Sequence, residues 1–187
     1  GLHQFNQEMW DTLRAMTTQD MLAASARLME LPEDAGPFEV YAAFAQFQRE
    51  EAAKNGRTYP PITGEQMMAA GVDWNIFPNM VFLQQPTCLL GYRARPYGDD
   101  PDRCIFEVYV LERFAPGQEP KVEVEDGGSD WRSVDWGLIL SQDFQNMEEV
   151  QKGMKSRAFA AARPNPLQEI EVSNFHRVYN ELLDRAE

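Results

Sequence analysis

Apolar positions recur at two different spacings along the chain, and the spacing changes near Gly71. Before it they return every third or fourth residue, as at Phe5, Met9 and Leu13, which predicts amphipathic helices. After it the runs "WNIFPNMVFLQQ", "TCLLGYRARP" and "RCIFEVYVLERFAP" are rich in aromatic and β-branched residues and are separated by turn signals, which predicts strands. The last third returns to helical spacing. The order helices, antiparallel strands, helices predicts an α+β fold in a single domain, with a helical lead-in over 1–71 and a sheet with helices over 72–187.

Polar residues mark where the first helices should begin and end. Thr18 is the expected cap of a helix over about 21–31. Thr63 and Gln66 have the spacing of a capping box, and Gly71 closes that short helix. The pair Asn55-Gly56 should end the helix before it.

The final helix should present one apolar face, with Ser173 or Asn174 as its cap. That face consists of Phe175, Val178, Tyr179, Leu182 and Ala186.

The segment "LILSQDFQNMEEVQKGM" carries the one candidate for chemistry. It is interpreted as a strand-like apolar run followed by a helix from about Asp143 to Ala162. The apolar face of this helix consists of Phe144, Met147, Val150 and Met154. At the N-terminus of this helix, the Asp143 carboxylate is either a helix cap or a metal ligand. Spacing alone favours the cap.

The run Ile105–Leu111 carries apolar groups at alternate positions on both faces, so this strand should be sandwiched between two layers. The polar, Gly-rich stretch "GQEPKVEVEDGGSDWRS" should be an exposed loop.

The net charge argues against two classes of partner, and the cysteine content bears on the location of the protein. The chain has 17 basic and 30 acidic residues, a net charge of −13, which disfavours nucleic acid and anionic membrane as partners. No apolar run approaches the roughly 20 residues that span a bilayer. Cys88 and Cys104 are expected to be buried small hydrophobes rather than a disulfide, which favours a cytoplasmic location. Because the chain starts at Gly1 without methionine, we expect that its natural start lies elsewhere.

Self-contained catalytic motifs are absent from the sequence. His3 and His176 are the only histidines, and neither belongs to a metal-binding motif. There is no nucleotide fingerprint and no Gly-x-Ser-x-Gly elbow. The acidic pairs Glu50-Glu51 and Glu148-Glu149 are expected to face water, and His176 is expected to be a surface or capping residue.

The stretch "QDFQNMEEVQKGM" resembles the acidic motif in the catalytic domain of Rieske-type aromatic ring-hydroxylating dioxygenase α subunits. Asp143, Glu148, Gln151 and Gly153 match its Asp, its Glu-x-x-Gln and its glycine. The strand "IFPNMVFL", the following "YRARPYGDDPDRCIFEVYVLERFAPG" and the closing "EVSNFHRVYNELL" resemble later parts of the same family. The resemblance runs from about Gly71 to the end, and the first seventy residues fit it loosely.

The resemblance implies a helix-grip (Bet v1/START-like) fold, here incomplete, with an antiparallel sheet and long C-terminal helices. It also implies mononuclear Fe(II) held by two histidines and one carboxylate, and Asp143 matches the carboxylate. Leu83, Ala94 and Ile139 fall where the family lines its substrate cavity, although ordinary core packing explains them equally well. The paired histidines and the Rieske [2Fe–2S] motifs have no counterpart in this sequence, so the cluster is expected only on a missing N-terminal domain.

Three functions remain open at this point. The first is the C-terminal catalytic portion of a dioxygenase that inserts O₂ into an aromatic substrate, as in aromatic hydrocarbon catabolism. The resemblance then implies a ferredoxin or reductase as electron donor and a trimer or an α/β assembly. This chain alone should be inactive. The second is a non-catalytic helix-grip domain that binds a hydrophobic ligand. The third is a degenerate subunit that packs on a full-length oxygenase.

Overall fold

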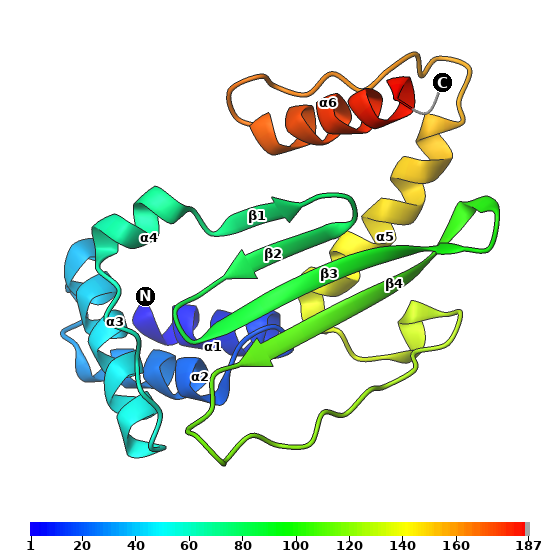
Figure 1. The fold of residues 1–187 in the computed structure, drawn as a ribbon. Coiled ribbons are helices and arrows are strands. Elements are labelled where there is room, and N and C mark those ends of the chain that lie inside the picture. The colour runs from blue at the N-terminus through cyan, green and yellow to red at the C-terminus, as the bar shows by residue number, and fades with distance from the viewer. Residues whose placement is uncertain (186–187) are drawn as a thin grey trace. The chain divides into compact units, whose positions relative to one another are not determined.

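The computed structural model describes residues 1–185, which form helices and one four-stranded sheet (Figure 1). In chain order the elements are α1 (Leu2–Leu13), α2 (Gln19–Ala26), the 3₁₀ turn η1 (Arg27–Glu30), α3 (Pro37–Lys54), α4 (Gly64–Ala70), β1 (Asp73–Ile76), β2 (Met80–Gln84), β3 (Cys88–Tyr97), β4 (Asp100–Glu112), the 3₁₀ turn η2 (Trp131–Ser133), α5 (Gly137–Met154) and α6 (Ile170–Asp184).

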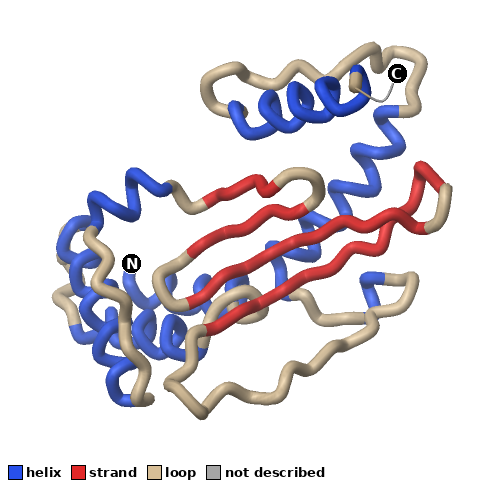
Figure 2. Tube along the Cα trace, in the orientation of Figure 1, coloured by secondary structure: helices blue, strands red, loops and turns tan. Residues whose placement is uncertain are grey.

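The strands follow one another in the sheet in their sequence order, β1-β2-β3-β4, and the pairs β1·β2 and β2·β3 are antiparallel. Leu83 lies opposite Asp73 on one side and Leu90 on the other. The predicted α+β class with a helix-grip type of antiparallel sheet is therefore confirmed. The predicted exposed loop is also observed, as the long tan segment between β4 and α5 in Figure 2.

The chain forms two compact units. The first comprises Gly1–Pro61, Pro86–Cys88 and Glu112–Glu149, and the second comprises Ile62–Gln85, Leu89–Leu111 and Val150–Glu187. In the first unit, Ala24, Leu28 and Phe47 form a buried cluster between α2, η1 and α3. Burial of these apolar groups is what holds the short helices in place, because isolated helices of this length are marginal in water.

Arg57 is the centre of a part-buried polar network in the first unit. Its guanidinium lies 2.8 Å from Asp20 Oδ2 and also pairs with Glu112. Asn55 donates a second hydrogen bond to Asp20, at 2.7 Å. Asp20 is buried, and these donors compensate the loss of its hydration.

Glu51 departs from the expected solvent-facing position. It is buried at 9% exposure on α3, where it accepts from Lys54 at 2.6 Å and from Arg27 at 3.1 Å. The Lys54 hydrogen bond lowers the pKa of Glu51, and Arg27 adds to this effect. The helical period alone did not indicate the contact with Arg27, because Arg27 is 24 residues away.

In the second unit, the two faces of the sheet have different chemistry. On one face, Tyr92 of β3 stacks on Phe106 of β4 with ring centroids 5.7 Å apart. On the other face, Glu107 accepts hydrogen bonds from Arg93 at 2.5 Å, Tyr109 at 2.7 Å and Arg95 at 2.8 Å. The hydrogen bond from Arg93, with those from Tyr109 and Arg95, lowers the pKa of Glu107 to about 2.

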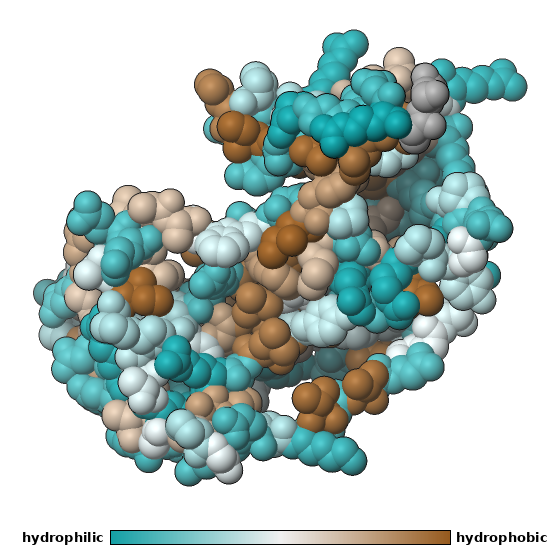
Figure 3. Space-filling model, viewed as in Figure 1, coloured by the Kyte–Doolittle hydropathy of each residue, from teal (hydrophilic) through white to brown (hydrophobic). Residues whose placement is uncertain are grey.

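The predicted burial of β4 on both faces is not observed. Ile105, Phe106, Val110 and Leu111 remain exposed. Brown patches on the face drawn in Figure 3 show that apolar side chains elsewhere also stand on the surface. The alternation predicted the strand correctly, but it did not determine what covers the strand.

Most predicted helix ends are confirmed and some are wrong. Thr18 accepts from the Met21 amide, and Thr63 and Gln66 form the full capping box. The helix after Thr18 is shorter than expected, because it tightens into η1 at Arg27. Helix α6 begins at Ile170 rather than at Ser173 or Asn174, and Ala186 lies outside the described residues.

The two cysteines are free and lie in different environments. Cys88 is buried as expected, whereas Cys104 is exposed, contrary to the prediction. Burial, and the negative charge of Glu112, raise the pKa of Cys88 to about 11. Every helix within residues 1–185 is too short or too polar to span a bilayer.

Candidate functional site

Helix α5 begins six residues earlier than the sequence predicted, and this changes the place of Asp143. The apolar run before Asp143 is the first turn of the helix rather than a strand. The Asp135 carboxylate accepts a 3.0 Å hydrogen bond from the Gly137 amide, and Gly137 adopts the left-handed φ of 71° that favours glycine. Asp143 is therefore an interior helix residue and not a cap, and the helix ends at Met154 rather than Ala162.

Asp143 lies exposed within an apolar stripe of α5. Ile139 and Met147 precede and follow it by four residues, which places all three on one side of the helix. Val150 and Met154 continue the same stripe. Met147, Val150 and Met154 are 45%, 51% and 54% exposed, so of the four residues predicted to form the apolar face of this helix only Phe144 is buried. A carboxylate set among uncovered apolar side chains is unlike an ordinary solvated helix face.

The buried side of α5 holds the helix in the first unit. Leu140 and Phe144 are 1% and 5% exposed. The ring of Phe144 meets those of Trp131 and Trp136 edge to face, with centroids 5.8 Å and 5.2 Å apart. The Trp136 indole also donates to the Trp131 carbonyl at 2.7 Å. Asp143 is thus next in sequence to Phe144, one of the buried residues that hold its helix.

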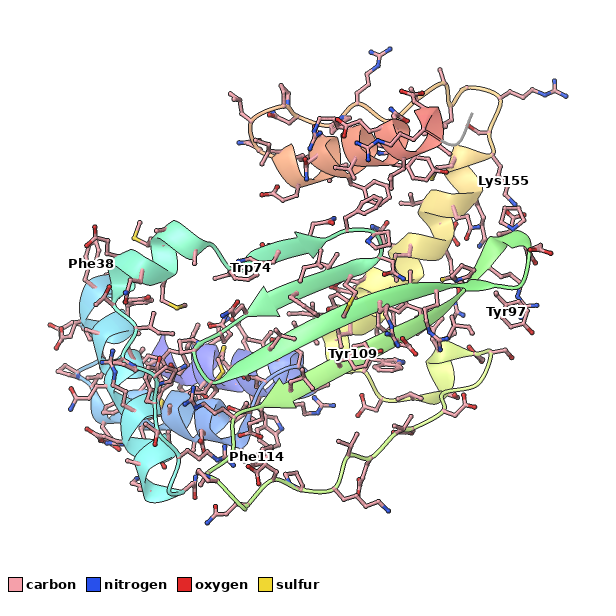
Figure 4. The ribbon with its side chains drawn as sticks, viewed as in Figure 1. Phe38, Trp74, Tyr97, Tyr109, Phe114 and Lys155 are labelled. Carbon is pink, nitrogen blue, oxygen red and sulfur yellow. The ribbon has the colours of Figure 1, made fainter. Side chains whose placement is uncertain are left out.

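The other two polar members of the acidic motif make long-range hydrogen bonds. Glu148 Oε1 accepts from Trp131 Nε1 at 2.7 Å, and Glu148 Oε2 accepts from Arg132 at 3.0 Å. Gln151 donates to the backbone carbonyl of Asp102 at 3.0 Å. Figure 4 labels Lys155, which pairs with the same Asp102 and lowers its pKa, at the C-terminal end of α5. The expectation that Glu148 faces water is therefore incomplete, because its carboxylate is bonded on both oxygens.

The three predicted pocket residues lie on two units. Leu83 is half-buried in β2, and Ala94 is exposed in β3, where it exchanges two hydrogen bonds with Asn79. The register places Leu83 and Ala94 on the same face of the sheet. Ile139 is half-buried in the first unit, one turn before Asp143. Their role in binding substrate stays a prediction.

The described residues fit one ligand of an iron site and not a complete one. Within residues 1–185, no group of three histidine, cysteine, aspartate or glutamate side chains could hold a metal ion. His3 and His176 are both exposed, and the ring centroids of His176 and Phe175 are 5.4 Å apart. The Asp143 carboxylate is an oxygen donor of the type that suits Fe(II).

The fold and the acidic helix define the class: an α+β domain with an antiparallel sheet and a lone carboxylate in an apolar helix stripe. The family described as ring hydroxylating alpha subunit (catalytic domain) matches residues 3–185. The chain therefore belongs to this family, and the match includes the first seventy residues, which the sequence resemblance had left loosely placed. Neither the comparison with curated proteins nor that with solved structures found a match.

Family membership supports an oxygenase function. Members of the family generally use non-haem Fe(II), act on aromatic substrates with O₂, and work with electron-transfer partners in oligomers.

Sequence reasoning missed the residues that hold the acidic helix. Trp131 and Arg132 lie in a polar stretch with no periodic pattern, 17 and 16 residues before Glu148. Asp135 was overlooked as well, although Asp-x-Gly before an apolar run is a recognisable turn signal. The Trp131 and Arg132 contacts depend on how the loop folds back, which no local pattern encodes.

Proposed function

We propose that this chain is the carboxylate-bearing C-terminal part of a ring-hydroxylating dioxygenase catalytic domain. In the intact protein, Asp143 would supply one oxygen ligand to mononuclear Fe(II), and two histidines from polypeptide outside this sequence would supply the others. Bound iron of this type activates O₂ beside an aromatic substrate. The Rieske [2Fe–2S] cluster would lie on an N-terminal domain that is likewise outside this sequence.

The observation that carries this proposal is the setting of Asp143. Its carboxylate stands in the exposed apolar stripe of α5, between Ile139 and Met147. Once covered by further polypeptide, such a stripe would form an apolar wall with one anionic group, which suits both an aromatic substrate and a ferrous ion. The family match supports the same function independently.

Ile139, Leu83 and Ala94 would line the substrate cavity in this protein. A ferredoxin or reductase would deliver the electrons, and the subunits would assemble as a trimer or with a β subunit. The free thiols of Cys88 and Cys104 support a reducing compartment such as the cytoplasm.

The test measures Fe(II) binding by the full-length gene product, under anaerobic conditions and in competition with a chelator. The variant Asp143→Asn removes the charge at nearly constant size, and Glu149→Gln makes the matched change at an exposed position of the same helix. We expect Asp143→Asn to weaken Fe(II) binding by at least about tenfold and to abolish aromatic oxygenation, and Glu149→Gln to leave both unchanged.

Equal Fe(II) binding by both variants would overturn the proposal. If the full-length protein bound no iron but bound an aromatic ligand, the non-catalytic helix-grip function would replace it. Isolation of the chain in complex with a separate, complete oxygenase subunit would instead support the degenerate-subunit function.

A further inference from the structure

We infer that Glu148 and Gln151 are positioning residues that fix the direction of the Asp143 carboxylate, by holding helix α5 to two other segments of the chain. This inference rests on the proposed function, because it concerns how the proposed ligand is presented. The residues of the acidic motif then have different roles: the aspartate binds Fe(II), and the glutamate and the glutamine hold the helix in place.

Glu148 makes the first attachment, within the first unit. Both of its oxygens accept hydrogen bonds from η2: one from the Trp131 indole at 2.7 Å and the other from Arg132 at 3.0 Å. The Arg132 guanidinium also lies over the Trp131 ring, 4.3 Å from its centroid. Since the Trp131 ring contacts Phe144, the same tryptophan meets α5 at two successive turns.

Gln151 makes the second attachment, within the second unit. Its amide donates to the Asp102 carbonyl at 3.0 Å, at the start of β4. Lys155, one turn later, pairs with the Asp102 carboxylate. The C-terminal part of α5 is therefore bound to the β3–β4 hairpin through a backbone group, whose position is set by the sheet.

The spacing of the motif explains why these attachments leave Asp143 free. At about 100° per residue, Glu148 and Gln151 lie about 140° and 80° around the helix from Asp143. Phe144 lies about 100° around, between them. The three anchors share one side of α5, so together they resist rotation about the helix axis while the Asp143 side stays open.

Rotation matters because a metal ligand must be held within about 0.5 Å of its productive position. Residues that only orient a ligand typically change metal affinity by 10- to 100-fold when they are replaced. A purely structural role would instead change stability without depending on Asp143.

The first experiment measures amide hydrogen exchange on this 187-residue chain. We expect Glu148→Ala and Gln151→Ala to speed exchange of the α5 amides near Asp143 by about tenfold. Gln145→Ala is the matched control for Gln151→Ala, because it makes the same change at another exposed position of α5. Glu148→Gln keeps an acceptor for the Trp131 indole and should restore most of the protection. Exchange in the Ala variants equal to that in Gln145→Ala would overturn the inference.

The second experiment measures the Fe(II) dissociation constant of the full-length gene product in a double-mutant cycle. We expect Glu148→Ala and Gln151→Ala each to weaken binding by about tenfold, and to have no further effect once Asp143→Asn is present.

The outcomes separate the two proposals. Should Asp143→Asn weaken Fe(II) binding while Glu148→Ala and Gln151→Ala behave like Gln145→Ala, only the positioning role is overturned. An equal loss in the presence and absence of Asp143 would also overturn it, because the residues would not act through the ligand. If Asp143→Asn itself has no effect, the proposed function fails and the positioning role fails with it.

Discussion

The Asp135 carboxylate accepts a hydrogen bond of 3.0 Å from the amide of Gly137, and helix α5 begins at that glycine. This bond lowers the pKa of Asp135, and the ion pair with Arg14 adds to the effect. The carboxylate that starts the helix is thus eight residues before Asp143, which is left without a capping role.

Asp135→Ala should therefore destabilise the chain, whereas Asp143→Ala should not. We expect the first variant to lower Tm by roughly 2 °C and the second to leave it within about 1 °C, since exposed helix positions tolerate alanine. Thermal unfolding followed by circular dichroism checks both. A larger drop for Asp143→Ala than for Asp135→Ala would contradict this account of the helix start.

Leu28 tests the core of the first unit. It is fully buried against Ala24 and Phe47, so Leu28→Ala should cost about 2–5 kcal/mol of unfolding free energy. The neighbouring Met29 is 49% exposed, and Met29→Ala should change that free energy by less than about 0.5 kcal/mol. Denaturant unfolding of the two variants measures the difference, and similar losses would show that Leu28 is not a core residue.

Arg57 should be essential to the polar network of the first unit. Its removal leaves the buried Asp20 carboxylate with one fewer donor and leaves Glu112 without this cation. Breaking a buried pair from one side commonly costs 3–5 kcal/mol, so Arg57→Ala should cost about 3 kcal/mol. The double variant Arg57→Ala/Asp20→Asn removes both charges and should recover part of this loss in the same denaturant assay. An additive loss in the double variant would argue against the coupling.

Protonation of Glu107 should lower the free energy of unfolding in acid. Its folded pKa of about 2 lies below its ordinary value of 4.5, so the folded state favours the ionised carboxylate. The resulting stabilisation is complete above pH 4.5 and is lost as the pH falls from about 4.5 to 2. Glu107→Gln should flatten the dependence of unfolding free energy on pH in this window. An unchanged acid profile in the variant would contradict the pairing with Arg93.

The two thiols should differ sharply in reactivity. Cys104 is exposed, whereas Cys88 is buried with its pKa raised to about 11. At pH 8 a thiol reagent should modify one cysteine rapidly and the second only on unfolding. The variant Cys104→Ser should lose the rapid phase, and persistence of that phase would show that Cys88 is accessible.

The sequence by itself determined the class of the fold, the strands and several helix caps. These features depend on local chemistry, such as the capping box of Thr63 and Gln66 and the alternation in β4. The acidic motif also led to the correct family, because the order and spacing of its residues are visible along the chain.

Only the tertiary structure decided the roles of the individual acidic residues. Asp143 is an interior helix residue because the helix begins at Gly137, whose amide is bound by Asp135. Glu51 can be buried because Arg27, in η1, donates a hydrogen bond to its carboxylate. Glu148 became an anchor because the loop folds back to bring Trp131 against it. Each of these three roles depends on contacts with residues elsewhere in the chain. Such contacts outweigh the local helix propensity of a residue, and they produce no repeating pattern that could be recognised in the sequence.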